Sequence, residues 1–94
     1  MSTIRVKQPH TISVDEAKQR LADFESAMAK YGVSLAWTGA RAKIKGMAVS
    51  GGIDVTDSLV DVTLKLGMMA RARGVDSARL EASITKRLKS LFED

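Results

Sequence analysis

Apolar residues recur at every second position through the middle of the chain, in three runs within residues 33–66. The apolar positions of these runs are Leu35 and Trp37, then Ile53 and Val55, then Val60, Val62, Leu64 and Leu66. Side chains two positions apart lie on the same face of a strand, so each run predicts a strand with one apolar face. Residues 38–40 and 56–58 are polar or contain glycine and have the length of hairpin turns. The pattern predicts an antiparallel meander.

The third strand of the predicted sheet, residues 41–55, changes phase within its length. Its first half places Ala42 and Ile44 on the apolar face, whereas its second half places odd-numbered residues such as Ile53 there. One extra residue would supply this change, and glycine tolerates the conformation of a β-bulge. We therefore expect a bulge at Lys45-Gly46 within one long, bent strand.

A first helix is predicted from Ser13 to Tyr31 by its two ends and its apolar spacing. Ser13 and Glu16 form an S-x-x-E capping box at the start. Gly32 follows the end, where glycine adopts the left-handed conformation at little cost. Between these signals the apolar residues recur at intervals of four and three, which marks one face of a helix: Ala17, Leu21, Phe24, Met28 and Tyr31.

A second helix, of about four turns, is predicted after Asp76, whose side chain suits an N-cap. Val75 before the cap and Leu80 after it would form a hydrophobic staple. The apolar stripe consists of Leu80, Ile84, Leu88 and Leu91. This amphipathic helix should pack beside the first one on the apolar face of the sheet.

The first strand completes the expected fold. Ile4 and Val6 alternate with charged residues, and the strand should end near Pro9, which cannot donate to a sheet ladder. We expect one α+β domain over residues 1–94 in the order β-α-β-β-β-α, with four mainly antiparallel strands and two helices on one face. The position of the first strand stays open. A homodimer through sheet edges or helices is also expected.

The composition limits the classes of function. The 94 residues support one core, and because cysteine is absent from the sequence, we expect no disulfide and a cytoplasmic location. No stretch approaches the ~20 apolar residues that span a bilayer. The net charge of +4 is spread along the chain, which disfavours nucleic-acid binding. A weak nucleic-acid-binding module would use the one basic face that aligns on a strand: Arg41, Lys43 and Lys45.

No constellation of residues predicts a catalytic, metal or cofactor site. His10 is the single histidine, and the sequence has no cysteine or second histidine to complete a metal ligand set with it. The serines and threonines lie in no nucleophile motif, and Gly51-Gly52 lies in no phosphate-binding motif. We therefore expect a protein that is not an enzyme, in which His10 packs at the strand end or caps the helix approach.

Two groups of apolar residues are candidate contact sites. Met68 and Met69 lie beside Arg71 and Arg73, and such a segment can dock on an apolar surface that carries anionic groups. The second group is expected in the core, but it would wall a ligand cavity if one lay between the helices and the sheet. That arrangement would make the chain a lipid or small-hydrophobe binding protein, with these wall residues: Trp37, Phe24 and Met28.

Several short segments, taken in order along nearly the whole chain, resemble one small family. They are I-x-V followed by His10, the D-E-A of residues 15–17, the Y-G of residues 31–32, Trp37 with Gly39, the glycines at 46 and 51, and V-x-V-x-L-x-L-G at residues 60–67. This is the polyhydroxyalkanoic acid system family, also called the polyhydroxyalkanoate granule-region family. The resemblance implies no catalytic residue.

The same resemblance implies a bacterial, cytoplasmic accessory or regulatory protein of storage-polyester metabolism, with granule surfaces or granule proteins as partners. A granule surface would favour exposed apolar side chains with a basic rim. In the sequence, the segment from Met68 to Arg73 has this character. It is therefore the candidate granule contact.

Overall fold

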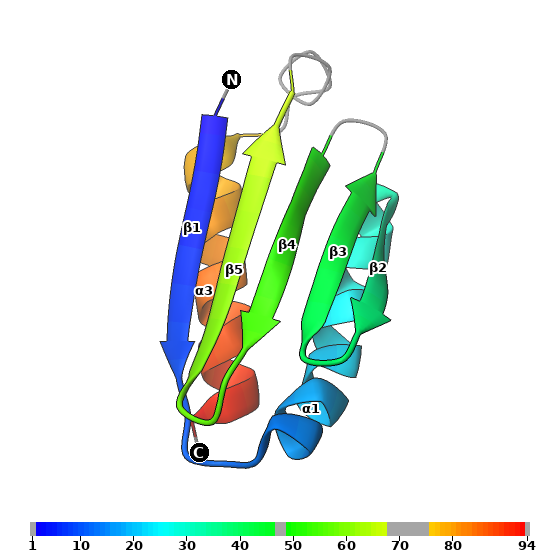
Figure 1. Ribbon diagram of the computed structural model, residues 1–94. Coiled ribbons are helices and arrows are strands. Elements are labelled where there is room, and N and C mark those ends of the chain that lie inside the picture. Colours follow the sequence, from blue (N-terminus) through cyan, green and yellow to red (C-terminus); the bar gives the residue numbers. More distant parts are fainter. Residues whose placement is uncertain (1, 47–48, 68–75, 94) are drawn as a thin grey trace.

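A computed structural model describes residues 2–46, 49–67 and 76–93. The elements follow the order β1 (Ser2–Pro9), α1 (Val14–Met28), the 3-10 turn η1 (Ala29–Tyr31), β2 (Val33–Thr38), β3 (Arg41–Gly46), β4 (Val49–Val55), β5 (Leu59–Leu66) and α3 (Ser77–Phe92). The five strands form one antiparallel sheet in the order β1-β5-β4-β3-β2, and both helices cover the same face (Figure 1). The predicted α+β class is confirmed.

The prediction of four strands with a bulge at Lys45-Gly46 is wrong, because the chain reverses between β3 and β4. Lys45 pairs with Ser50, and Gly46 pairs in register with Val33 of β2. In the β3–β4 hairpin each even-numbered residue faces an odd-numbered one, and directly opposed residues share a face of the sheet. The change of phase therefore comes from a reversal of the chain, which alternation alone cannot distinguish from a bulge.

The first strand lies at one edge of the sheet, beside β5. Its pairing runs from Ser2 opposite Leu66 to Pro9 opposite Leu59, so β1 ends at Pro9 as predicted. Immediately after it, the His10 amide donates to the Ser58 carbonyl at 3.0 Å. The end of β1 is thus tied to the β4–β5 turn at residues 56–58, whereas Ser2 at its start lies opposite Leu66.

The predicted cap residues are used, but the first helix is α-helical only to Met28, and residues 29–31 form the 3-10 turn η1. Ser13 Oγ accepts a hydrogen bond from the Glu16 amide at 3.1 Å. Gly32 has φ of +71° and ends η1 in the left-handed conformation, which other residues rarely adopt. Asp76 Oδ1 accepts from the Ala78 amide at 2.9 Å and caps α3. The proposed staple involves Val75, which lies outside the described residues.

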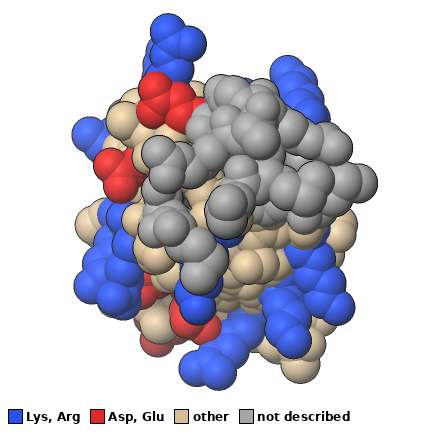
Figure 2. All heavy atoms as spheres, turned by 90° about the horizontal axis from the view of Figure 1, so that it is seen from above, with Lys and Arg blue, Asp and Glu red and all other residues tan. Residues whose placement is uncertain are grey.

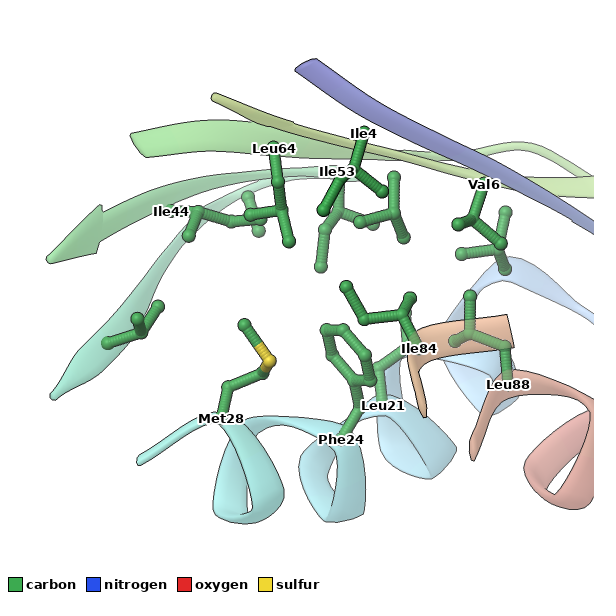
Figure 3. Close-up of a cluster of buried hydrophobic side chains, with 14 of the residues drawn as sticks. Ile4, Val6, Leu21, Phe24, Met28, Ile44, Ile53, Leu64, Ile84 and Leu88 are labelled. Atoms are coloured by element: carbon green, nitrogen blue, oxygen red, sulfur yellow. The ribbon is translucent and has the colours of Figure 1, made fainter. Parts of the chain in front are cut away.

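The core fills the space between the sheet and the two helices (Figure 3). Helix α1 packs over β2 and β4, and α3 packs over β1. Burying each large apolar side chain contributes roughly 1.5–3 kcal/mol. The labelled core residues come from both layers: Ile4, Val6, Ile44, Ile53 and Leu64 from strands, Leu21, Phe24 and Met28 from α1, and Ile84 and Leu88 from α3.

Strand β4 contains two adjacent glycines with different surroundings. A Cβ atom at Gly51 would overlap the backbone carbonyl oxygen of Thr63 on β5. At Gly52 the nearest atom to such a Cβ is the Ala42 carbonyl oxygen at 3.4 Å, an ordinary contact. The approach of β4 to β5 therefore requires glycine at position 51 and not at position 52.

Candidate functional site

A groove of about 420 Å³ lies between the two helices, and we call it the helix groove. Helix α1 and η1 supply one wall, and α3 supplies the other. Because α1 and α3 are both joined to the sheet through the core, the groove sits on a rigid base. Its lining residues are Phe24, Ala27, Met28 and Lys30 on one side, and Leu80, Ser83, Ile84, Lys86, Arg87 and Ser90 on the other.

Short side chains on the facing sides of the helices explain why the groove stays open. Ala27 faces it from α1, while Ser83 and Ser90 face it from α3. Closely packed helices interdigitate larger side chains at such positions, and small residues on both sides leave the space between them unfilled. These three small residues therefore leave room for the groove.

The groove combines an apolar floor with a cationic rim. Phe24 and Ile84 are buried and form part of the floor, whereas Lys30, Lys86 and Arg87 are exposed at its borders. Among the described residues, none that lines the groove carries a carboxylate. Figure 2 looks onto one end of the molecule. It shows Lys and Arg around the perimeter of the molecule in this view and the visible acidic groups toward the left. An amphiphile with an anionic group fits this combination.

Near the start of α1, hydrogen bonds join the end of α3 to α1 and to β1, and we call this region the closed end. Arg20 Nη1 donates to the Leu91 carbonyl at 2.8 Å and thereby satisfies a carbonyl in the last turn of α3. Gln8 Nε2 donates to Glu93 Oε2 at 3.0 Å, which links β1 to the end of α3. These contacts hold the helices together where α1 begins and α3 ends.

His10 belongs to the closed end and has a structural role. Its Nε2 donates to the Thr56 carbonyl at 2.7 Å, while its Nδ1 accepts from the Ile12 amide at 3.3 Å. The ring also packs against Phe92, with ring centroids 5.6 Å apart. The two nitrogens of the buried imidazole thus join residues 10–12 to the β4–β5 turn, and the ring face contacts α3 through Phe92.

The predicted cavity residues lie in two places. Phe24 and Met28 line the helix groove, so the structure brings these two together at a concave surface. Trp37 lies on β2, half-buried, with Lys18 Nζ 5.0 Å from the ring centroid, and it does not line the groove. The cationic rim was not predicted from the sequence, although Lys86 and Arg87 lie beside the apolar stripe of α3 there.

The predicted basic face lies on the outer side of the sheet, away from the helices. Arg41 is paired there with Asp54 at 2.8 Å, while Lys43 and Lys45 border a shallow hollow over Gly51-Gly52. Lys65 of β5 borders the same hollow. The sequence does not show this last contribution, because it depends on the pairing of β4 with β5.

A second ion pair lies on the outer sheet face. Arg5 donates to the Asp61 carboxylate at 3.3 Å from Nε and 2.9 Å from Nη2. This hydrogen bonding stabilises the charged carboxylate and lowers the pKa of Asp61 below its usual range. Two of the cations on this face are thus already paired with carboxylates.

The other predicted contact, Met68, Met69, Arg71 and Arg73, lies outside the described residues. Within residues 2–46, 49–67 and 76–93, no cluster of three or more histidine, aspartate or glutamate side chains is arranged to hold a metal ion. The helices of this same part of the chain are too short or too polar to cross a bilayer.

Comparisons with known proteins agree with the fold. The crystal structure of TTHA0849 from Thermus thermophilus matches with a TM-score of 0.54 and 14% identity, covering 96% of this chain and 94% of that one. At this identity the likeness concerns the fold alone. No curated protein sequence matches the chain. A family model described as "Putative polyhydroxyalkanoic acid system protein" matches residues 4–92. The chain therefore belongs to the polyhydroxyalkanoic acid system protein family.

Proposed function

We propose that this protein is a non-enzymatic accessory protein of the polyhydroxyalkanoic acid system and that it associates with the storage polyester through the helix groove. The observation that carries the proposal is the apolar floor of the groove beside three cations, Lys30, Lys86 and Arg87. The description of the family is the reason for choosing the storage polyester as the ligand, and the groove is the surface to which we propose that it binds.

The chemistry of such a polymer fits the groove. A polyester of hydroxyalkanoic acids has apolar alkyl groups, ester carbonyls that accept hydrogen bonds, and a carboxylate at one terminus. The floor offers apolar contact through Phe24 and Met28, Ser83 and Ser90 offer hydroxyl donors, and the rim offers cations for the carboxylate. The size of the groove, about 420 Å³, is that of sites that hold part of one chain.

The non-enzymatic part of the proposal rests on the use of His10. Its two ring nitrogens are engaged with backbone groups, so the ring acts as a structural link between three segments. The groove itself is lined by apolar side chains, serines and cations. These groups favour binding over proton transfer.

Cosedimentation with isolated polyester granules tests the proposal. We expect Lys86→Glu/Arg87→Glu to reduce the pelleted fraction severalfold, because it reverses the charge of the rim. Lys43→Glu/Lys45→Glu makes the same change in net charge on the outer sheet face and should pellet like the unmodified protein. Retained binding by the first variant would contradict the proposal. If Met68→Glu/Met69→Glu alone abolished pelleting, the contact would lie in residues 68–73.

A second candidate function, binding of a free fatty acid or similar small hydrophobe, is favoured by the same volume. Displacement of a fluorescent fatty acid by unlabelled ones would measure it. The variant Ala27→Leu/Ser83→Leu fills the groove without changing charge and should abolish displacement. A protein that binds granules but no fatty acid would leave the first function standing and remove the second.

A further inference from the structure

The two edges of the sheet differ in how they are protected against pairing with another strand. At one edge, β1 carries Arg5 and Lys7 and ends at Pro9. Charged residues and proline are the usual means by which proteins prevent an edge strand from pairing with another chain. At the other edge lies β2, which pairs with β3 and with no other described strand.

Strand β2 has none of these protections. Its sequence, VSLAWT, contains no charged residue and no proline. Leu35 and Trp37 are half-buried on the side facing the helices, and Ala36 is exposed on the outer side. An uncharged strand with half-buried apolar side chains at a sheet edge is a template for pairing, and its own copy is chemically a suitable partner.

The hairpin turn shows which backbone groups of β2 are available. The two-residue turn at Gly39-Ala40, with φ of +62° at Gly39, closes on the pair Thr38 and Arg41. The closing pair of a two-residue hairpin is hydrogen-bonded, and such pairs alternate with non-hydrogen-bonded ones along the ladder. The backbone groups of alternate residues therefore point outward from the sheet edge: those of Val33, Leu35 and Trp37.

We infer that two copies of this chain pair through β2 in antiparallel fashion, with Leu35 opposite Leu35 of the second copy. In this register Val33 opposes Trp37 of the second copy, so all three outward-pointing residues exchange hydrogen bonds. Opposed residues share a face, so Ser34 opposes Ala36 on the outer side and the helices of both copies lie on the same side. Two five-stranded sheets become one continuous sheet.

Charge and area set the strength of this pairing. The cationic strands β3 of the two copies would lie about 14 Å apart, three strand spacings, which exceeds the Debye length of about 8 Å at physiological salt. Their repulsion is therefore largely screened at physiological salt. A seam of six residues per copy is smaller than a standard interface, so the dimer is weak and depends on concentration.

The natural chain has no cysteine, so introduced cysteines report the register directly. Ser34→Cys and Ala36→Cys are both at exposed positions. In the proposed register the Cα atoms of residues 34 and 36 lie about 4.5 Å apart across the seam, whereas each residue lies about 8 Å from its own copy, beyond disulfide reach. Mild oxidation should therefore yield disulfide-linked dimer when the two variants are mixed and little with either alone.

Each other result of this crosslinking overturns the inference. Linkage by Ala36→Cys alone would place Ala36 on the axis and exclude the register. Failure of the mixture to crosslink would exclude the pairing, and linkage of Thr3→Cys, placed on the β1 edge as a control, would locate the contact there. Light scattering provides a second measurement: Ala36→Lys should weaken dimerisation by about tenfold or more, and Thr3→Lys should leave it unchanged.

Discussion

The centre of the sheet and the helix groove differ in their tolerance for added atoms. At Gly51 a single Cβ would overlap a backbone oxygen of β5, whereas the groove leaves about 420 Å³ between α1 and α3. The sheet is tight because a backbone ladder sets its spacing. The groove is bordered by three small residues, Ala27, Ser83 and Ser90, which leave room between the helices. Added atoms are therefore expected to destabilise the sheet centre more than the helix layer, where the proposed binding surface lies.

Substitution of Gly51 by Ala in the sheet centre should cause the largest loss in the free energy of unfolding. The added Cβ forces β4 away from Thr63 on β5, and we expect a loss of about 3 kcal/mol or more in the free energy of unfolding. Urea unfolding followed by circular dichroism measures it. The matched control is Gly52→Ala, whose Cβ meets only an ordinary contact and should cost about 1 kcal/mol or less. Equal losses of unfolding free energy for Gly51→Ala and Gly52→Ala would show that β4 and β5 do not pack closely at Gly51.

His10→Ala tests the closed end and should cause the second-largest loss of unfolding free energy. It leaves the Thr56 carbonyl and the Ile12 amide without their partner and removes the contact with Phe92. We expect a loss of about 2 kcal/mol in unfolding free energy. Amide hydrogen exchange should show faster exchange near the start of α1 and the end of α3. A neutral result would mean that water replaces the imidazole at no cost.

Ala27→Leu tests the helix groove and should change the free energy of unfolding little. The added atoms enter the helix groove instead of a packed core, so the unfolding free energy should change by less than about 1 kcal/mol in either direction. The same substitution should lower ligand binding in the displacement assay. A strongly destabilised variant would indicate that the groove is too narrow to receive a side chain.

The smallest effect is expected for Asp61→Asn on the outer sheet face, and it should depend on pH. The pKa of Asp61 is lowered in the folded state by hydrogen bonds from Arg5, so the pair stabilises the fold above the unfolded pKa of about 3.9. This contribution is lost as pH falls through the folded pKa. The natural protein should therefore exceed the variant in melting temperature at neutral pH, and the difference should vanish near pH 2. A difference that persists there would assign the effect to packing.

The helices show how far local signals extend. Ser13, Gly32 and Asp76 end their helices through hydrogen bonds or backbone conformations that involve residues within four positions. Such interactions depend on little outside the segment, which is why they could be predicted correctly. The extent of β1 followed in the same way from Pro9.

The number of strands and the position of the candidate site could not be predicted from local sequence signals. The residues around Gly46 are compatible with a bulge or a hairpin, and only the pairing of Lys45 with Ser50 decides between them. The groove could not be placed because it depends on which faces of α1 and α3 meet. Phe24 and Met28 line this groove between the two helices, whereas the predicted cavity lay between the helices and the sheet, and Trp37 is not among the described lining residues.

The amino-acid sequence by itself determined the class of fold, the cap residues of the helices and the apolar face of each strand, because these follow from spacing and caps within a few residues. The tertiary structure decided the reversal after β3, the place of β1 beside β5 and the gap between α1 and α3. It also decided that Lys65 joins Lys43 over one hollow and that β2 is left at an edge. These features depend on contacts between residues distant along the chain, and periodicity carries no information about which distant segments meet.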